Sequence, residues 1–306
     1  MSYAFSNRSI AGARTAEIPR QAEWRAPSVP ISLIITTYNW PRALDLVLTS
    51  VSRQRRMPDE VIVTDDGSSA ETARLVASWA RRLGVPLHHI WQENKGFRAG
   101  RCRNRGIAAA RGEYLILLDG DMVIDEWFVA DHARVRERGS FVQGVRISTS
   151  ASCTDRMMTE RVTSVGPLTR GLRRPHLAVR NGWLSKHLSR PTLTMPRVKS
   201  CNMGHWREDL IAVNGFNEQM HGWGPEDKEV AARLMHAGVR GWQLRFAALA
   251  THLHHLSRAP TGINPNDAIL AATLGSRATR CDLGIDQHLA EFLHGIPKSA
   301  RPPWPL

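Results

Sequence analysis

The chain has 306 residues, 42% of them hydrophobic, and carries a formal net charge of +13. This composition predicts a globular fold with a sizeable core. It excludes a membrane span, because no run approaches roughly 18 consecutive apolar residues. The positive charge predicts an anionic partner, with a nucleotide, a phosphorylated glycan, an acidic membrane surface and nucleic acid as candidates.

The cysteines and the N-terminus indicate a compartment. Cys102, Cys153, Cys201 and Cys281 are scattered without C-x-x-C spacing, so neither a zinc site nor a disulfide framework is expected. Residues 1–28 lack the apolar core of a signal peptide. We therefore expect a cytoplasmic protein whose residues 1–29 form a flexible arm.

Predicted strands and helices alternate from residue 31 to residue 119. A run rich in β-branched residues at 31–38 predicts the first strand, and Pro41 predicts the start of a helix that ends near Ser52. The next predicted strands lie at 60–65, 87–91 and 114–118, and the helices between them at 70–83 and 99–110. This alternation predicts an α/β fold with a mostly parallel central sheet flanked by helices.

Polar residues stand at the ends of three of these strands. Thr36 ends the first, Asp65 and Asp66 end the second, and Asp119 ends the fourth. Because ligands bind parallel sheets at the carboxyl ends of the strands, we expect these residues to share one crevice. No G-x-G-x-x-G follows the first strand and no P-loop motif occurs, which disfavours a dinucleotide-binding Rossmann site and a P-loop NTPase.

Asp119-Gly120-Asp121 follows the apolar run Tyr114–Leu118. Positions i and i+2 point to the same side of an extended segment, so both carboxylates can converge on a divalent cation such as Mn²⁺ or Mg²⁺. Gly120 leaves room for a phosphate or a sugar. A solvated turn is the alternative, and the convergence of three strand ends favours the cation.

The segment after this motif changes in character. We expect a helix at 125–137 and a strand at 140–148. From 151 to 200, ten Lys or Arg stand against two acidic residues, and prolines interrupt the chain. We expect short helices and loops there, with the charge forming either a solvated face or a patch for an anionic acceptor or membrane surface.

Trp223-Gly224-Pro225 precedes a helix predicted at 226–237, which opens with Glu226 and Asp227. The helix dipole favours acids at this position, which would explain them without catalysis. A tryptophan on a glycine-flanked loop, however, suits stacking on a sugar ring. A carboxylate beside that loop can take a proton from an acceptor hydroxyl.

Three histidines, His252, His254 and His255, follow a strand predicted at 242–249. One imidazole would complete an aspartate-bound Mn²⁺ site. Neither H-E-x-x-H nor Cys/His zinc spacing is present, so hydrolytic zinc chemistry is not expected. The tail carries one predicted helix at 267–277 and a loose, proline-rich end from Pro297.

The ordered set of motifs resembles family 2 glycosyltransferases. The nucleotide-binding half of that family is matched by Ile35–Asn39, Val63–Ser68, Asn94–Gly96, Arg103-Asn104 and Asp119–Asp121. The acceptor half of its galactosyltransferase-like and chondroitin-polymerase-like branch is matched by Asn214–Glu218 and Gly222–Asp227. The resemblance implies a GT-A domain at 30–256, with a nucleotide-sugar half (30–125) and an acceptor half (126–256). A basic insertion (151–199) lies within the acceptor half, and 257–306 form a C-terminal extension.

The resemblance also implies roles for single residues. Thr36 and Asp66, or Asp65, would hold the base and ribose, and Arg103 would lie near the nucleotide. Asp119 and Asp121 would bind Mn²⁺ or Mg²⁺ and the diphosphate. Asp227 matches the catalytic base, Glu226 the residue that orients the acceptor hydroxyl, and Trp223 with Gly224 the acceptor-binding loop. His252 matches the metal-binding histidine, with His254 and His255 as alternatives.

The implied activity is inverting transfer from a nucleotide-sugar, usually a UDP-sugar, to a glycan or lipid-linked acceptor. We expect a role in cell-envelope polysaccharide or lipopolysaccharide synthesis at the inner face of the cytoplasmic membrane. A nucleotidyltransferase is disfavoured because residues 36–41 form no Gly-rich basic loop. A nucleic-acid-binding protein is suggested by the charge and ten tryptophans, but the chain has no recognisable reading module, so nucleic acid is not expected as a partner.

Overall fold

The computed structural model describes residues 29–191, 198–256 and 264–304. The predicted arm therefore lies outside the described residues, apart from Val29. None of the helices in these three ranges is both long and apolar enough to cross a membrane.

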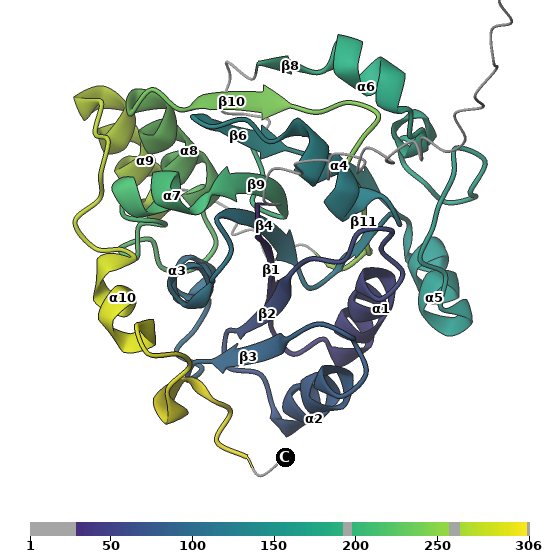
Figure 1. The fold of residues 1–306 in the computed structure, drawn as a ribbon, viewed down its shortest axis with the longest axis horizontal. Coiled ribbons are helices and arrows are strands. Elements are labelled where there is room, and N and C mark those ends of the chain that lie inside the picture. The colour runs from purple at the N-terminus through teal and green to yellow at the C-terminus, as the bar shows by residue number, and fades with distance from the viewer. Residues whose placement is uncertain (1–28, 192–197, 257–263, 305–306) are drawn as a thin grey trace, which may run out of the picture.

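An eight-stranded sheet forms the centre of the molecule (Figure 1), with the order β3-β2-β1-β4-β9-β6-β10-β8. Its first half is parallel and is made by β1 (Ile31–Thr37), β2 (Glu60–Asp65), β3 (Leu87–Trp91) and β4 (Tyr114–Asp119). Its second half is mixed and is made by β6 (Ser140–Gln143), β8 (Arg190–Pro191), β9 (Asn202–Trp206) and β10 (Arg240–Gln243). The predicted α/β fold with a mostly parallel sheet is confirmed.

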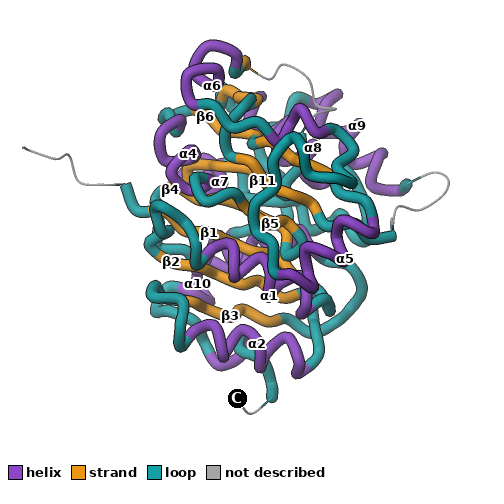
Figure 2. Tube along the Cα trace, turned by 90° about the vertical axis from the view of Figure 1, so that its right-hand side faces the viewer, coloured by secondary structure: helices purple, strands orange, loops and turns teal. Residues whose placement is uncertain are grey.

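Helices cover both faces of this sheet, as Figures 1 and 2 show. One layer contains α1 (Pro41–Val51), α2 (Ala70–Ala80), α4 (Phe128–Val135) and α5 (Ala151–Glu160). The other contains α3 (Ala99–Ala109), α7 (Arg207–Ala212), α8 (Glu226–His236), α9 (Pro265–Ser276) and α10 (Asp286–Phe292). The alternation of side chains along each strand supplies both cores: Leu33 and Ile35 pack in one cluster, and Ile34 packs in the other.

A second sheet of three short strands has the order β5 (Met122–Ile124), β11 (Leu249–His252) and β7 (Val145–Ser148). The strand predicted at 140–148 is therefore two strands in two sheets. They separate at Gly144, where a Cβ atom would lie 2.4 Å from the Asn202 amide. The strand predicted at 242–249 was also wrong as one element, because Phe246 and Ala248 adopt positive φ angles of 59° and 50°.

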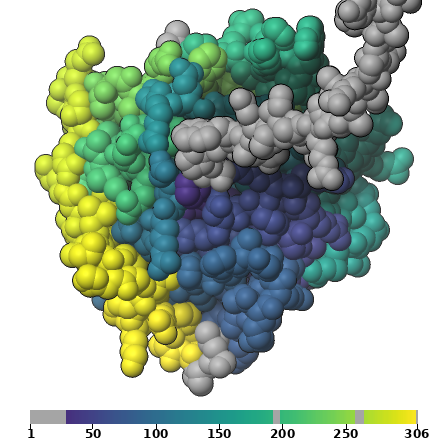
Figure 3. All heavy atoms as spheres, viewed as in Figure 1, coloured from purple at the N-terminus to yellow at the C-terminus, as the bar shows by residue number. Residues whose placement is uncertain are grey.

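The basic insertion forms short elements, as predicted: α5, the 3₁₀ turn Pro175–Ala178, α6 (Gly182–Leu188) and β8. The C-terminal prediction needs correction. Residues 264–304 pack along the flank of the core, visible as the yellow band in Figure 3. Helix α10 was not predicted, and the end is not loose as far as it is described, because Ala300 is fully buried and the Trp304 ring meets Trp91 edge-on.

Two buried histidines lie on opposite faces of the sheet, His132 on α4 and His205 on β9 beside Phe141. His132 and His205 are fully buried, and neither ring nitrogen of His205 has a hydrogen-bond partner among the described residues. Burial lowers the pKa of His132 to about 4, with a hydrogen bond to Asn202 opposing the shift, and lowers the pKa of His205 to about 3. Both rings are therefore neutral in the folded protein at physiological pH.

These histidines predict acid sensitivity. The unfolded chain takes up their protons near pH 6.5, whereas the folded protein does so only near pH 4 and pH 3. Stability should therefore fall as the pH drops below about 6.5, by up to about 1.4 kcal/mol per pH unit for each histidine. His205→Phe, which keeps the stacking on Phe141, should remove half of this slope in urea unfolding between pH 6 and pH 5. The exposed His294→Gln is the control, and equal slopes for both variants would contradict the assignment.

Candidate functional site

The carboxyl ends of β1, β2 and β4 meet at one edge of the sheet. Thr36 pairs with Asp119 in the strand register, and the Gly120 N–H donates to the Thr36 carbonyl oxygen at 2.7 Å. Space is tight at Gly120, because a Cβ atom there would lie 3.0 Å from Thr37. The predicted convergence of these strand ends is therefore present.

The two aspartates after β2 have different environments. Asp65 is fully buried, and its carboxylate accepts the Ser68 N–H at 2.7 Å and lies 3.0 Å from His89 Nε2. This carboxylate shapes the turn. Asp66 lines a cavity and accepts hydrogen bonds from Gln92 Nε2 and the Arg98 N–H, while burial raises its pKa. Of the two residues, Asp66 is the one placed to meet a ligand.

This cavity has a volume of about 170 Å³ and is lined by Tyr38, Asp66, Asn94, Gly96, Phe97 and Trp223. Its walls come from both predicted halves of the domain. The Gly222 N–H donates to the Phe97 carbonyl oxygen at 3.0 Å, which ties the loop after β3 to the loop before α8. The predicted nucleotide-binding and acceptor-binding segments therefore share a cavity wall.

Arg103 on α3 connects the same two halves at a deeper level. Its guanidinium donates to Asp119 Oδ1 at 2.9 Å and to Glu226 Oε1 at 3.2 Å, and it lies 5.4 Å from the Phe216 ring centre. Burial opposes the charge of Arg103, but the neighbouring carboxylates raise its pKa above the usual range. The sequence placed Arg103 near the nucleotide; the structure makes it a bridge between two predicted site carboxylates.

The acid pair opens α8, as predicted. Burial raises the pKa of Glu226 to about 7, with Arg103 opposing the shift and Asp227 adding to it. Burial also raises the pKa of Asp227, while its Oδ1 accepts the Lys228 N–H at 2.8 Å. Both carboxyl groups therefore hold a proton more readily than exposed ones, which suits a group that must accept one.

The Trp223-Gly224 loop is held from the C-terminal extension. The Trp223 side chain is 49% exposed, while its carbonyl oxygen accepts hydrogen bonds from the Asn264 and Asn266 side chains at 3.0 and 3.3 Å. A Cβ atom on Gly224 would lie 2.5 Å from Asn266. Both asparagines were missed in the sequence, where they stand in a tail without a recognised motif.

A second cluster gathers Asp121, His252 and His255, whose ligand atoms all lie within 4.8 Å of one another. The imidazole Nε2 atoms of His252 and His255 lie 3.4 and 3.1 Å from Asp121 Oδ2. His254 is not part of this cluster. Its backbone N–H donates a hydrogen bond to Thr154 Oγ1. The structure thus adds His255 to the predicted His252, whereas Asp119, also predicted as a ligand, pairs with Arg103 and is not in the cluster.

This cluster fits a divalent cation. Asp121 Oδ1 is buried and has no hydrogen-bond partner among the described residues. Burial alone would raise the pKa of Asp121, but hydrogen bonds from both imidazoles hold it well below its usual range, so the carboxylate is charged. One carboxylate with two imidazoles suits Mn²⁺ better than Mg²⁺, which prefers oxygen ligands.

Comparison with known proteins identifies the family of this chain. The model of glycosyl transferase family 2 matches residues 32–195, and that of the N-terminal domain of galactosyltransferase matches residues 185–256. The chain therefore belongs to glycosyl transferase family 2. It spans only part of the length of the curated relatives that it matches, 56% of one and 23% of another.

Two relatives and one solved structure illustrate the similarity. Validoxylamine A glucosyltransferase of Streptomyces hygroscopicus subsp. limoneus is 27% identical over 275 residues, which cover 84% of this chain and 56% of the relative. Chondroitin synthase of Pasteurella multocida (strain Pm70) is 26% identical over 233 residues, 69% of this chain and 23% of the relative. The structure of GalNAc-T7 with UDP, GalNAc and Mn²⁺ has a TM-score of 0.59 at 14% identity, covering 81% of this chain and 49% of that one.

The cluster predicts which histidines bind a metal. His255→Ala and Asp121→Ala should each weaken Mn²⁺ binding about 10-fold or more, because each removes a ligand from a three-residue set. His254→Ala is the matched control and should bind Mn²⁺ as the wild type does, because its ring lies outside the set. Calorimetric titration of Mn²⁺ into the three variants measures this. Equal losses in the His254 and His255 variants would contradict the assignment.

Proposed function

We propose that this chain is a metal-dependent inverting glycosyltransferase that transfers a sugar from a UDP-sugar to a hydroxyl of a glycan or lipid-linked acceptor. The observation that carries the proposal is the Arg103 bridge. It fixes Asp119, at the donor end of the sheet, to Glu226, which adjoins Asp227 at the start of α8. Asp119, proposed to bind the donor, and Asp227, the candidate base, are thereby held in the same site.

The cavity and the metal cluster support the choice of donor. Aromatic side chains of Tyr38, Phe97 and Trp223 line the cavity beside Asp66, which suits a nucleoside with a hydrogen-bonding base or ribose. GalNAc-T7, which shares the fold, was solved with UDP and Mn²⁺. When bound at Asp121, His252 and His255, the cation would neutralise charge on the diphosphate.

In this mechanism Asp227 takes the proton of the acceptor hydroxyl. The Lys228 N–H fixes one of its oxygens, and the raised pKa makes the carboxylate a stronger base than a solvated one. Glu226, held by Arg103, orients the acceptor, and Trp223 packs against it. The acceptor oxygen forms its bond to the anomeric carbon as the bond to the diphosphate breaks, and the nucleoside diphosphate leaves from the opposite face. One displacement inverts the anomeric centre.

The substitution Asp227→Asn should abolish turnover and leave donor binding unchanged. The variant should lose transfer by about 10³-fold or more, because the amide accepts no proton, yet bind the donor as the wild type does. Calorimetry with UDP, UDP-sugars, GDP-sugars and dTDP-sugars, with and without Mn²⁺, measures binding and should show Mn²⁺-dependent affinity for the UDP series.

Two results would count against this proposal. Loss of donor affinity in Asp227→Asn would remove the base assignment. Absence of Mn²⁺-dependent binding to every nucleotide in the wild type would remove the donor assignment itself.

We also propose that the acceptor is a cell-envelope glycan or lipid-linked glycan, reached at the inner face of the cytoplasmic membrane. The basic insertion supports this. Leu168 and Trp183 are 98% and 69% exposed, and the exposed Arg173 and Arg174 lie between them in the sequence. Exposed apolar side chains among positive charges suit an anionic lipid surface.

Removing two of these charges tests the membrane proposal. Each arginine near an anionic surface contributes about 1 kcal/mol, so Arg173→Gln/Arg174→Gln should weaken sedimentation with phosphatidylglycerol vesicles by about 30-fold. Arg74→Gln/Arg81→Gln on exposed positions of α2 and its C-cap is the matched control. Equal binding of the two double variants would show that the insertion is only a solvated face.

A further inference from the structure

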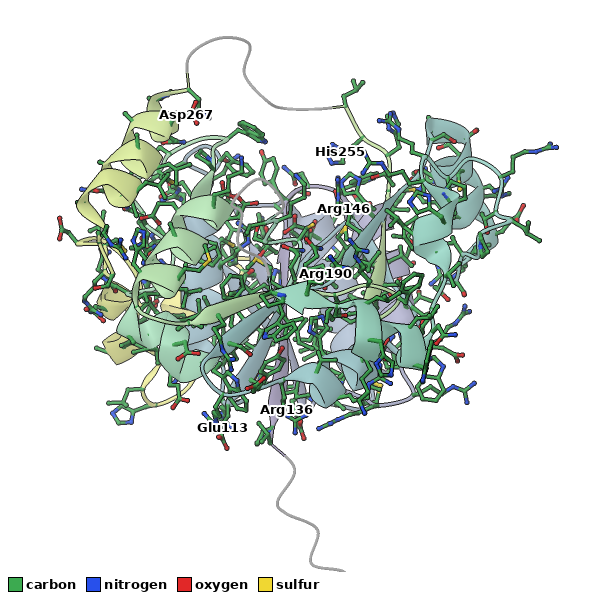
Figure 4. The ribbon with its side chains drawn as sticks, turned by 90° about the horizontal axis from the view of Figure 1, so that it is seen from above. Glu113, Arg136, Arg146, Arg190, His255 and Asp267 are labelled. Atoms are coloured by element: carbon green, nitrogen blue, oxygen red, sulfur yellow. The ribbon has the colours of Figure 1, made fainter. Side chains whose placement is uncertain are left out.

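Arg146 lies on the small sheet that carries the metal cluster, and no sequence motif singled it out. It pairs with Ala250 in the register of β7 and β11, and Ser148 pairs with His252. Because paired residues and positions two apart share a face, Arg146 and His252 lie on the same face of this sheet. Figure 4 shows Arg146 and His255 on the same side of the molecule, away from Glu113 and Arg136.

The guanidinium of Arg146 has no hydrogen-bond or ion-pair partner among the described residues. Its Nε atom is buried without a hydrogen bond, and no ion pair or hydrogen bond joins its side chain to any described residue. The buried arginines among the described residues are paired: Arg103 with Asp119 and Glu226, Arg105 with Glu291, and Arg233 with Glu229. A partly buried charge without a counter-charge loses hydration and gains nothing in return, so it destabilises the free protein.

The surroundings of Arg146 identify where a partner would bind. Arg146 stands two positions before Ser148, which pairs with His252, and His252 Nε2 lies 3.4 Å from Asp121 Oδ2. The charges of Asp119, Arg146 and Asp121 also all act on the buried Cys201 thiol. Neither carboxylate is within ion-pair distance of Arg146; Asp119 is paired with Arg103, and Asp121 is engaged by two imidazoles. The Arg146 guanidinium therefore lies beside the Asp121–His252–His255 cluster and forms no ion pair with either carboxylate.

We propose that Arg146 is a substrate-binding residue that pairs with an anionic oxygen group, a phosphate or a carboxylate, held next to the Asp121–His252–His255 cluster. A planar guanidinium donates two parallel hydrogen bonds to either group. The group has two possible sources, the diphosphate of the donor or a carboxylate on a substrate sugar. This inference rests on the proposed function, because it assumes that the cluster is part of a donor site.

The test compares Arg146→Gln with Arg240→Gln, which removes the same charge from an exposed pair with Glu137. Calorimetry in Mn²⁺ uses UDP, UDP-glucose and UDP-glucuronic acid. A charge-assisted pair corresponds to about 10-fold to 100-fold in affinity. If Arg146→Gln, but not Arg240→Gln, loses this affinity for all three ligands, the group that pairs with Arg146 is the diphosphate. If Arg146→Gln loses affinity only for UDP-glucuronic acid, the group is the carboxylate of the donor sugar. Wild-type affinity for all three, with an unchanged KM for the acceptor, overturns the proposal.

Two further measurements separate this proposal from a structural role and from failure of the proposed function. The melting temperature of Arg146→Gln should equal or exceed that of the wild type, because an unpaired charge is removed; a structural arginine would lower it on substitution. Inorganic pyrophosphate with Mn²⁺ should raise the melting temperature of the wild type more than that of the variant. Pyrophosphate protection without any nucleotide affinity would sustain the anion site and reject the UDP-sugar donor, whereas equal protection of both proteins would reject a diphosphate at Arg146.

Discussion

The buried guanidinium of Arg103 holds together elements that are far apart in the chain. It hydrogen-bonds to Asp119, at the end of β4, and to Glu226, at the start of α8, and only 4% of its surface is exposed. Removing one partner of such a buried pair costs about 3–5 kcal/mol, because the remaining charge is left without compensation. The distance between the carboxyl end of β4 and the acid pair is therefore fixed by electrostatics as well as by packing.

Helix α3 can hold this bridge because it is anchored on both sides of Arg103. The Asn104 amide donates to the Phe216 carbonyl oxygen and to Glu218, and Glu218 also contacts His288 at 2.7 Å. Arg105 pairs with Glu291 on α10. The C-terminal extension is thus part of the scaffold that orients the site, and through Asn266 it also supports the Trp223 loop.

The small sheet has a comparable role for the Asp121–His252–His255 cluster. Strand β5 is antiparallel to β11 and β7 is parallel to it, so the start of β5 and the ends of the other two strands meet at one edge. Asp121 immediately precedes β5, and its carbonyl oxygen accepts the Leu253 N–H at 3.0 Å. Asp121 and His252 come together because two short strands pair, and Arg146 reaches the same face through the third.

The sequence by itself determined the parallel half of the fold. Short apolar strands that alternate with helices between residues 31 and 119 carry strong local signals, and the polar residues at the strand ends follow from the geometry of parallel sheets. Thr36, Asp66 and Asp119 were therefore readable as site candidates, and the acid pair Glu226-Asp227 was readable from the Trp223-Gly224 loop that precedes it. The histidines at 252, 254 and 255 were readable as candidate metal ligands from their position after a predicted strand, and the family resemblance singled out His252.

Tertiary structure alone decided how these residues are partnered. Strands of three or four residues, such as β5 and β7, carry too little periodicity to be recognised, since they are stabilised by pairing with segments more than 100 residues away. The Arg103 bridge, the choice of His255 over His254, the support of Trp223 by Asn266 and the unpaired Arg146 all depend on side-chain directions set by that pairing. A linear pattern specifies which face a residue prefers, but long-range packing specifies which atoms meet there.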